Sequence, residues 1–147
     1  MKKELPDTPA ELNARALRLL ARREHSRAEL ARKLAPHAQS KEALDALLDF
    51  LCSKSQLSDE RFAETRANWL ARKYGAAKIR HDLKAKGVAE AIADRVCAGG
   101  ELERAQAILQ RKYRLAATTR EARAKRARFL QSRGFSYDTI RSVLELE

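Results

Sequence analysis

The chain has few of the residues that build β-sheets. Three Val and four Ile accompany 27 Ala and 20 Leu in its 147 residues, and Gly and Pro together number eight. β-Branched residues fill sheets, whereas Ala and Leu favour helices. A β-sandwich also needs many tight turns, for which this chain has too few Gly and Pro residues. The composition therefore excludes an all-β fold and leaves little room for a mixed α/β sheet.

Long apolar runs and paired cysteines are also lacking. No apolar run exceeds three residues, whereas a transmembrane helix needs about 20. No apolar stretch follows the charged residues 1–6, so we expect no secretory signal. Cys52 and Cys97 are isolated, and we expect both to be small buried hydrophobes in a reducing compartment. These absences predict a cytoplasmic protein without a membrane segment.

Helix-capping residues divide the chain into about nine short helices joined by connections of a few residues. We expect Gly75 to end one helix in a left-handed conformation, and another helix to cover residues 101–115. Six Ser or Thr residues stand where a helix is expected to begin: Thr8, Ser26, Ser40, Ser58, Thr118 and Ser136. The pattern predicts an all-α fold of short helices packed on their neighbours.

Three stretches, at residues 20–34, 70–83 and 130–144, resemble one another. Each has a helix that ends in basic residues, a tight turn, and a short helix with apolar residues four apart. The copies begin 50 and 60 residues apart, and we assign the extra ten residues to an added helix at 101–115. Tandem modules of this kind predict an elongated molecule. The expected divisions are a tail at 1–10 and helical modules at 11–56, 57–99 and 100–147.

No group of residues has the spacing of an enzyme site. His25, His37 and His81 are far apart in sequence, and none has a metal-binding spacing. A Gly-rich phosphate loop and a GxSxG motif are both absent from the sequence. We therefore predict a protein that is not an enzyme, with no catalytic residue, no metal site and no cofactor. A hydrolase or nuclease is the weakest alternative, which a cleavage assay with divalent metal would test.

Basic charge is the main chemical feature of the sequence. The formal net charge is +11, with +2 over residues 1–59, +6 over 60–119 and +3 over 120–147. An excess of this size predicts a polyanionic or acidic partner, although many cations on helices are simply solvated. Tyr74, Tyr113, Phe135 and Tyr137 lie near these charges, where they could stack on bases or serve as core residues. The residues expected to contact a partner are Arg72, Lys73, Arg80, Lys84, Arg123, Arg126 and Arg133.

Three motifs in order resemble those of the RecX family, the small regulators of the RecA recombinase. The stretch Leu57-Ser58-Asp59-Glu60-Arg61-Phe62-Ala63 resembles the family's Leu-x-Asp-x-x-Phe-Ala signature, and Gly75, Ile79, Leu83 and Lys86-Gly87-Val88 follow it. Arg133-Gly134-Phe135-Ser136 resembles the closing element, and residues 16–30 resemble the opening one. The resemblance covers roughly residues 11 to 146. The turn at 74–76 departs from the pattern because it lacks the capping Ser of the other two turns.

This resemblance implies tandem three-helix modules in a curved rod. It further implies binding to the RecA filament on single-stranded DNA, which lowers the ATPase, strand-exchange and co-protease activities. We expect the protein to be a monomer. The signature residues are mostly structural, so the resemblance assigns no contact residue. Single-stranded and double-stranded DNA are further candidate partners, and a plain non-specific DNA-binding protein is the alternative. Such a protein would bind DNA with a steep salt dependence and would ignore the recombinase.

Overall fold

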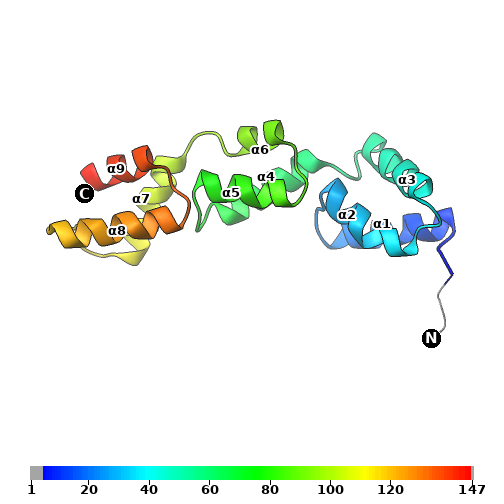
Figure 1. Cartoon of the computed structure of the whole chain (residues 1–147), viewed down its shortest axis with the longest axis horizontal. Helices are drawn as coiled ribbons and strands as arrows, with labels where there is room; N and C mark the ends of the chain where they lie inside the picture. Colours follow the sequence, from blue (N-terminus) through cyan, green and yellow to red (C-terminus); the bar gives the residue numbers. More distant parts are fainter. Residues whose placement is uncertain (1–4, 147) are drawn as a thin grey trace. The chain divides into compact units, whose positions relative to one another are not determined.

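The computed structural model describes residues 5–146, and within this range the chain forms nine α-helices, one 3₁₀ turn and no strand. The all-α prediction is confirmed. The first four residues of the expected tail lie outside the described range, as does Glu147. No helix among the described residues is both long and apolar enough to cross a membrane. The α-helices labelled in Figure 1 are α1 (Pro9–Arg22), α2 (Arg27–Leu34), α3 (Lys41–Ser53), α4 (Asp59–Leu70), α5 (Ala76–Ala85), α6 (Glu90–Val96), α7 (Glu101–Lys112), α8 (Arg120–Ser132) and α9 (Tyr137–Glu145). The 3₁₀ turn η1 (Ala35–His37) follows α2.

The helices form two compact units. The first unit comprises the chain up to Thr65 together with Lys86–Val88. The second comprises Arg66–Ala85 together with the chain from Ala89 onward. Helix α4 contributes its first residues to the first unit and its last residues to the second.

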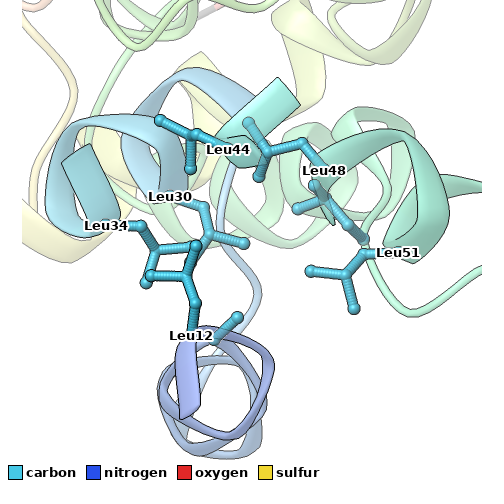
Figure 2. Close-up of a cluster of buried hydrophobic side chains, with 8 residues drawn as sticks. Leu12, Leu30, Leu34, Leu44, Leu48 and Leu51 are labelled. Atoms are coloured by element: carbon cyan, nitrogen blue, oxygen red, sulfur yellow. The ribbon is translucent and has the colours of Figure 1, made fainter. Parts of the chain in front are cut away.

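A cluster of leucines forms the core of the first unit. Leucines three or four residues apart lie on one face of a helix, and α1, α2 and α3 turn these faces toward one another. Figure 2 shows the side chains converging from the three helices. Full burial of one leucine stabilises a fold by about 1.5–3 kcal/mol. The buried members are Leu12, Ala16, Leu30, Leu34, Leu44, Leu48, Leu51 and Leu57.

The second unit has a mixed core in which α7, α8 and α9 meet. It contains β-branched and aromatic side chains as well as leucine, and partly buried Tyr113 and Phe129 pack against it. The rings of these two residues lie edge to face with centroids 6.4 Å apart. The buried members are Ala105, Ile108, Leu109, Leu130, Phe135, Ile140 and Val143.

Five of the six predicted helix caps are confirmed. Thr8, Ser26, Ser40, Ser58 and Ser136 each accept a hydrogen bond from the backbone N–H three residues later, at 3.0–3.2 Å. The sixth prediction is wrong by one residue, because Thr119 rather than Thr118 caps α8. The helix expected at 101–115 ends at Lys112, where the backbone becomes extended.

The prediction that Gly75 is left-handed is also wrong. Positive φ angles occur at Gly87 and Gly134 among other glycines, but not at Gly75. Gly75 is required for a different reason, because a Cβ atom there would lie 2.5 Å from the carbonyl oxygen of Gly134. The Gly75 amide donates to the Arg133 carbonyl at 2.8 Å. The turn between α4 and α5 therefore packs, backbone against backbone, on the turn between α8 and α9.

The first unit contains an equivalent junction. Ser26 Oγ donates to the Lys86 carbonyl at 2.7 Å, and a Cβ at Gly87 would lie 2.5 Å from Ala28 Cβ. Gly87 thus matches Gly134. Each has a positive φ just after a helix, α5 or α8, and each packs on the start of an earlier helix, α2 or α5. The third repeat copy predicted at 130–144 is therefore out of phase with the other two. Helix α7 is the first helix of its module and not an addition.

The first residue of a later helix, α4 for one junction and α7 for the other, caps each junction with its carboxylate. Asp59 Oδ1 accepts from the Arg27 amide at 2.7 Å, and Glu101 Oε1 accepts from the Ala76 amide at 3.2 Å. Ala76 begins α5, so Glu101 supplies the cap that the turn at 74–76 lacks in its own sequence. Burial raises the pKa of the Glu101 carboxyl, but hydrogen bonds from Thr139, Ala76 and Ser136 outweigh it and hold the pKa below its usual value.

The two cysteines differ in exposure. Cys97 is buried as expected, and burial raises the pKa of its thiol. The prediction that Cys52 is buried is wrong, because its side chain is exposed. Cys52 lies near the end of α3, where Leu48 and Leu51 already fill the inward face.

Candidate functional site

Three of the predicted contact residues converge in the second unit. Arg72 and Lys73 follow α4, and Arg133 follows α8. The packed turns at Gly75 and Gly134 bring these segments together. All three side chains line a hollow of about 400 Å³, which we call the inner hollow; its other lining residues are Ile108, Arg111, Lys112 and Phe129.

A larger hollow of about 830 Å³ lies between α4 and α5 and shares Arg72 and Lys73 with the inner one. We call it the outer hollow. Its lining includes two aromatic residues, Trp69 and Tyr74, and the further cation Lys78. The remaining lining residues are Arg66, Leu70, Ala77, His81, Asp82 and Ala85. The two hollows together form the basic groove.

Cations and aromatic rings alternate along the basic groove. Lys78 Nζ and Arg133 Cζ lie 5.3 and 5.6 Å from the centroid of Tyr74. Arg133 Cζ and Lys112 Nζ lie 5.2 and 3.8 Å from the centroid of Phe129. A cation over a ring gains about 0.5–1 kcal/mol at an exposed site. These contacts hold the long basic side chains in place before any partner binds.

Arg66 of the outer hollow pairs with Asp82 at 2.9 Å, but six other cations of the groove have no acidic partner among the described residues. Among the described residues, none of Arg72, Lys73, Lys78, Arg111, Lys112 and Arg133 forms an ion pair with a carboxylate. Arg111 instead donates to the Arg72 carbonyl at 2.7 Å, which ties α7 to the turn after α4. The positive charge of the groove is therefore available to an anionic ligand.

Three arginines of the first unit, in contrast, form ion pairs with carboxylates. Arg15 pairs with Asp7 at 2.8 Å, and Arg23 pairs with Glu29 at 2.8 Å. Arg27 pairs with Asp49 at 2.7 Å. Carboxylates therefore balance the charge of these three arginines, in contrast to the six groove cations.

The other predicted contact residues lie outside the groove. Arg80 pairs with Asp94 at 3.6 Å, and Lys84 is exposed on α5. Arg123 is exposed, and its Nε lies 3.5 Å from the Ala117 carbonyl oxygen. These three residues stay as predictions without a neighbouring site.

Arg126 does not fit the role of a surface contact. It is only 6% exposed, and its Nη2 donates to the Leu115 carbonyl. Its Cζ lies 4.3 Å from the centroid of Tyr113. Arg126 therefore holds the connection between α7 and α8, a role that charge patterning could not reveal because it does not show which cation of a helix faces inward.

Sequence reasoning missed several groove residues. Trp69 lines the outer hollow and is 60% exposed, but it was not among the predicted contact residues. Of the four predicted stacking residues, Tyr74 lines the groove and Phe135 is buried. The omitted residues are Trp69, Lys78, Arg111, Lys112 and Phe129. One sequence signal could have found this site. The single Trp of this aromatic-poor chain, Trp69, stands four residues before Lys73 in a basic turn.

The groove contains the groups needed to bind anions and flat rings. Guanidinium and ammonium groups bind phosphate or carboxylate oxygens, and aromatic faces accept stacked rings or cations. Among the described residues, no group of three or more His, Cys, Asp or Glu side chains could hold a metal ion.

Three family models match consecutive parts of the chain. They describe the first three-helix domain of RecX at residues 14–51, the second at 58–96 and the third at 100–144. The chain belongs to the RecX family. The resemblance seen in the sequence motifs is thereby confirmed.

Relatives named "Regulatory protein RecX" match nearly the whole chain. The one from Herbaspirillum seropedicae is 46% identical over 144 residues, covering 96% of this chain and 94% of the relative. The one from Leptothrix cholodnii is 46% identical over 139 residues, covering 92% and 88%. These RecX relatives are named as regulatory proteins and not as enzymes.

A crystal structure of RecX from Lactobacillus salivarius has the same fold. Its TM-score is 0.78 at 20% sequence identity, and the match covers 95% of this chain and 97% of that one. The basic groove described above thus lies in a RecX fold, with residues from its second and third three-helix domains.

Proposed function

We propose that this chain regulates the RecA recombinase by binding its filament on single-stranded DNA and lowering its ATPase, strand-exchange and co-protease activities. Membership of the RecX family over nearly the whole chain carries this proposal. The basic groove supports it, because a nucleoprotein filament offers phosphates and acidic side chains. The same features favour a regulator that acts by binding and not by catalysis.

Several modules in one chain suit a partner that is itself a repeating polymer. Linked contacts raise the effective concentration of each further contact, so overall affinity exceeds that of any single one. The groove supplies one such contact, in the second unit. The filament would then hold the chain through several weak sites, each of which can be mutated separately.

A direct test is the DNA-dependent ATPase of preformed RecA filaments, titrated with this protein at fixed salt and with excess single-stranded DNA. We expect activity to fall. Loss well below one protein per recombinase subunit would favour capping of filament ends or triggered disassembly. Loss only near stoichiometry would favour occupancy of the filament groove. Unchanged ATPase across the titration would overturn the proposed regulation.

Charge reversal tests the groove. We expect the triple variant Arg72→Glu, Lys73→Glu and Arg133→Glu to need at least about tenfold more protein for half-inhibition, since it removes three unpaired cations from one site. A matched control carries Arg120→Glu, Lys125→Glu and Arg128→Glu, which are exposed on α8 outside the groove. Equal inhibition by the two variants, with unchanged helical circular dichroism, would contradict a role for the groove.

A non-specific DNA-binding protein is the second candidate, and the unpaired cations favour it. Each phosphate contact on single-stranded DNA contributes about −0.7 to the slope of log affinity against log salt. Four to five contacts from the groove would therefore give a slope of about −3. Binding with this slope, combined with ATPase inhibition that added DNA fully relieves, would favour this candidate over filament regulation.

A further inference from the structure

The indole of Trp69 lies largely in solvent within a hollow rich in cations. Its residue is 60% exposed, although tryptophan is usually mostly buried in folded proteins. Arg72, Lys73 and Lys78 line the same hollow without acidic partners among the described residues. An exposed ring beside unpaired cations combines the two groups that single-stranded nucleic acids require, a stacking surface and counter-charges for phosphates.

A fixed arginine supports the indole. Arg66 Cζ lies 5.2 Å from the centroid of the Trp69 ring. The Arg66 guanidinium is held by both carboxylate oxygens of Asp82, at 2.9 and 3.0 Å. This bidentate pair balances the charge of Arg66 and restrains its plane. The indole is therefore positioned in advance, so that ordering it on binding costs little.

The size of the outer hollow suits a nucleotide segment. Its volume of about 830 Å³ falls within the range of about 300–1,000 Å³ that is typical of ligand sites. Tyr74 lines the same hollow with Lys78 5.3 Å from its ring centroid, so the path from Trp69 continues to a second ring. The inner hollow then extends the row of cations through the shared Arg72 and Lys73.

We propose that the outer hollow binds single-stranded nucleic acid, with a base stacked on Trp69 and phosphates on Arg72, Lys73 and Lys78. The inference deepens the proposed function, on which it rests for its biological setting, but the contact itself requires no recombinase. Unpaired bases are needed, because a duplex hides their faces in its own stack. An acidic protein surface would use the cations but would leave the indole without a matching ring.

The single tryptophan makes the contact directly observable. The test titrates the full chain at low salt with an oligothymidylate of about twelve nucleotides and records tryptophan emission. We expect strong quenching by this probe and little quenching by an abasic phosphodiester chain of equal length and charge. Equal quenching by both chains would overturn stacking. Tighter binding of polyglutamate than of the oligonucleotide would overturn the choice of ligand in favour of an acidic protein.

Variants locate the contact. By anisotropy of a labelled oligothymidylate, Trp69→Ala is expected to lose about tenfold in affinity and Trp69→Phe to keep most of it. Phe50→Ala removes another exposed aromatic residue, in the first unit, and is expected to change nothing. Unchanged affinity of Trp69→Ala would refute the site. Quenching without ATPase inhibition would support this contact and overturn the proposed regulation. ATPase inhibition without quenching would support the regulation and overturn this contact.

Discussion

Replacing Gly75 with Ala should disrupt the junction that assembles the basic groove. The new Cβ would lie 2.5 Å from the Gly134 oxygen, and 2.6 Å from both the Gly134 carbonyl carbon and the Phe135 nitrogen. These are backbone atoms, so no side chain can rotate away. The two turns must separate by about 1 Å to restore ordinary contact distances. Arg133 would then move away from Arg72 and Lys73.

The expected cost can be worked from three contributions. Overpacking against backbone costs about 1–3 kcal/mol, and loss of the hydrogen bond from Gly75 to Arg133 costs about 1 kcal/mol more. Because Gly75 has no positive φ, replacing it with Ala also restricts the unfolded chain and returns about 0.4–1 kcal/mol. The net loss in free energy of unfolding is about 2 kcal/mol.

Two further glycines separate backbone strain from close approach. Gly99→Ala places a Cβ where no atom lies within 4 Å, so its cost is only the strain at φ +75°, about 1 kcal/mol. Gly134→Ala combines strain at φ +86° with a Cβ 2.9 Å from the Lys78 nitrogen, and should cost about 3 kcal/mol. Because Gly75 and Gly134 share one contact, their double variant should cost less than the two single variants added together.

Urea unfolding followed by circular dichroism measures the global loss in stability. Hydrogen exchange of amides in α5 and α8 assigns it to the second unit, which matters because a chain of two units need not unfold in one step. Oligonucleotide affinity should fall together with stability as the groove opens. A Gly75→Ala chain as stable as the parent, with unchanged affinity, would refute the role given to this junction.

Two more predictions concern buried polar residues. Arg126→Ala removes the hydrogen bond to the Leu115 carbonyl and the contact with the Tyr113 ring, and should lower the free energy of unfolding by about 2 kcal/mol. The control variant Arg123→Ala should change it by no more than about 0.5 kcal/mol. Equal urea midpoints for the two variants would contradict this prediction. Burial lowers the pKa of His25, whose Nε2 lies 2.9 Å from Lys33 Nζ. The unfolded chain then binds the proton more readily, so stability should hold above pH about 7 and fall as pH drops below about 6.5. In His25→Gln this slope should disappear, and a pH dependence that the variant retains would argue against His25 as its source.

The helices and most of their caps follow from the sequence because the interactions that define them are local. An N-cap bond spans three residues, and a leucine face repeats every three or four, so each is contained in a short window. The caps at Ser26 and Ser136 were predicted on this basis and confirmed. The one-residue error at Thr118 arose because Thr119, beside it, offers the same hydroxyl group. The family motifs were also readable, since they consist of residues in a fixed order.

The junctions and the groove depend on residues far apart in sequence. Nothing near Gly75 shows that the Gly134 carbonyl will approach it, or that Glu101 will cap the helix that follows it. The same limit applies to the cations, because charge patterning counts them without showing which face of a helix they occupy. Helix packing buries Arg126 and brings Arg133 beside Arg72. The order of residues is enough to predict the helices, the family and the excess of basic charge. Which cations form one site depends on the fold, because backbone contacts between distant turns bring them together.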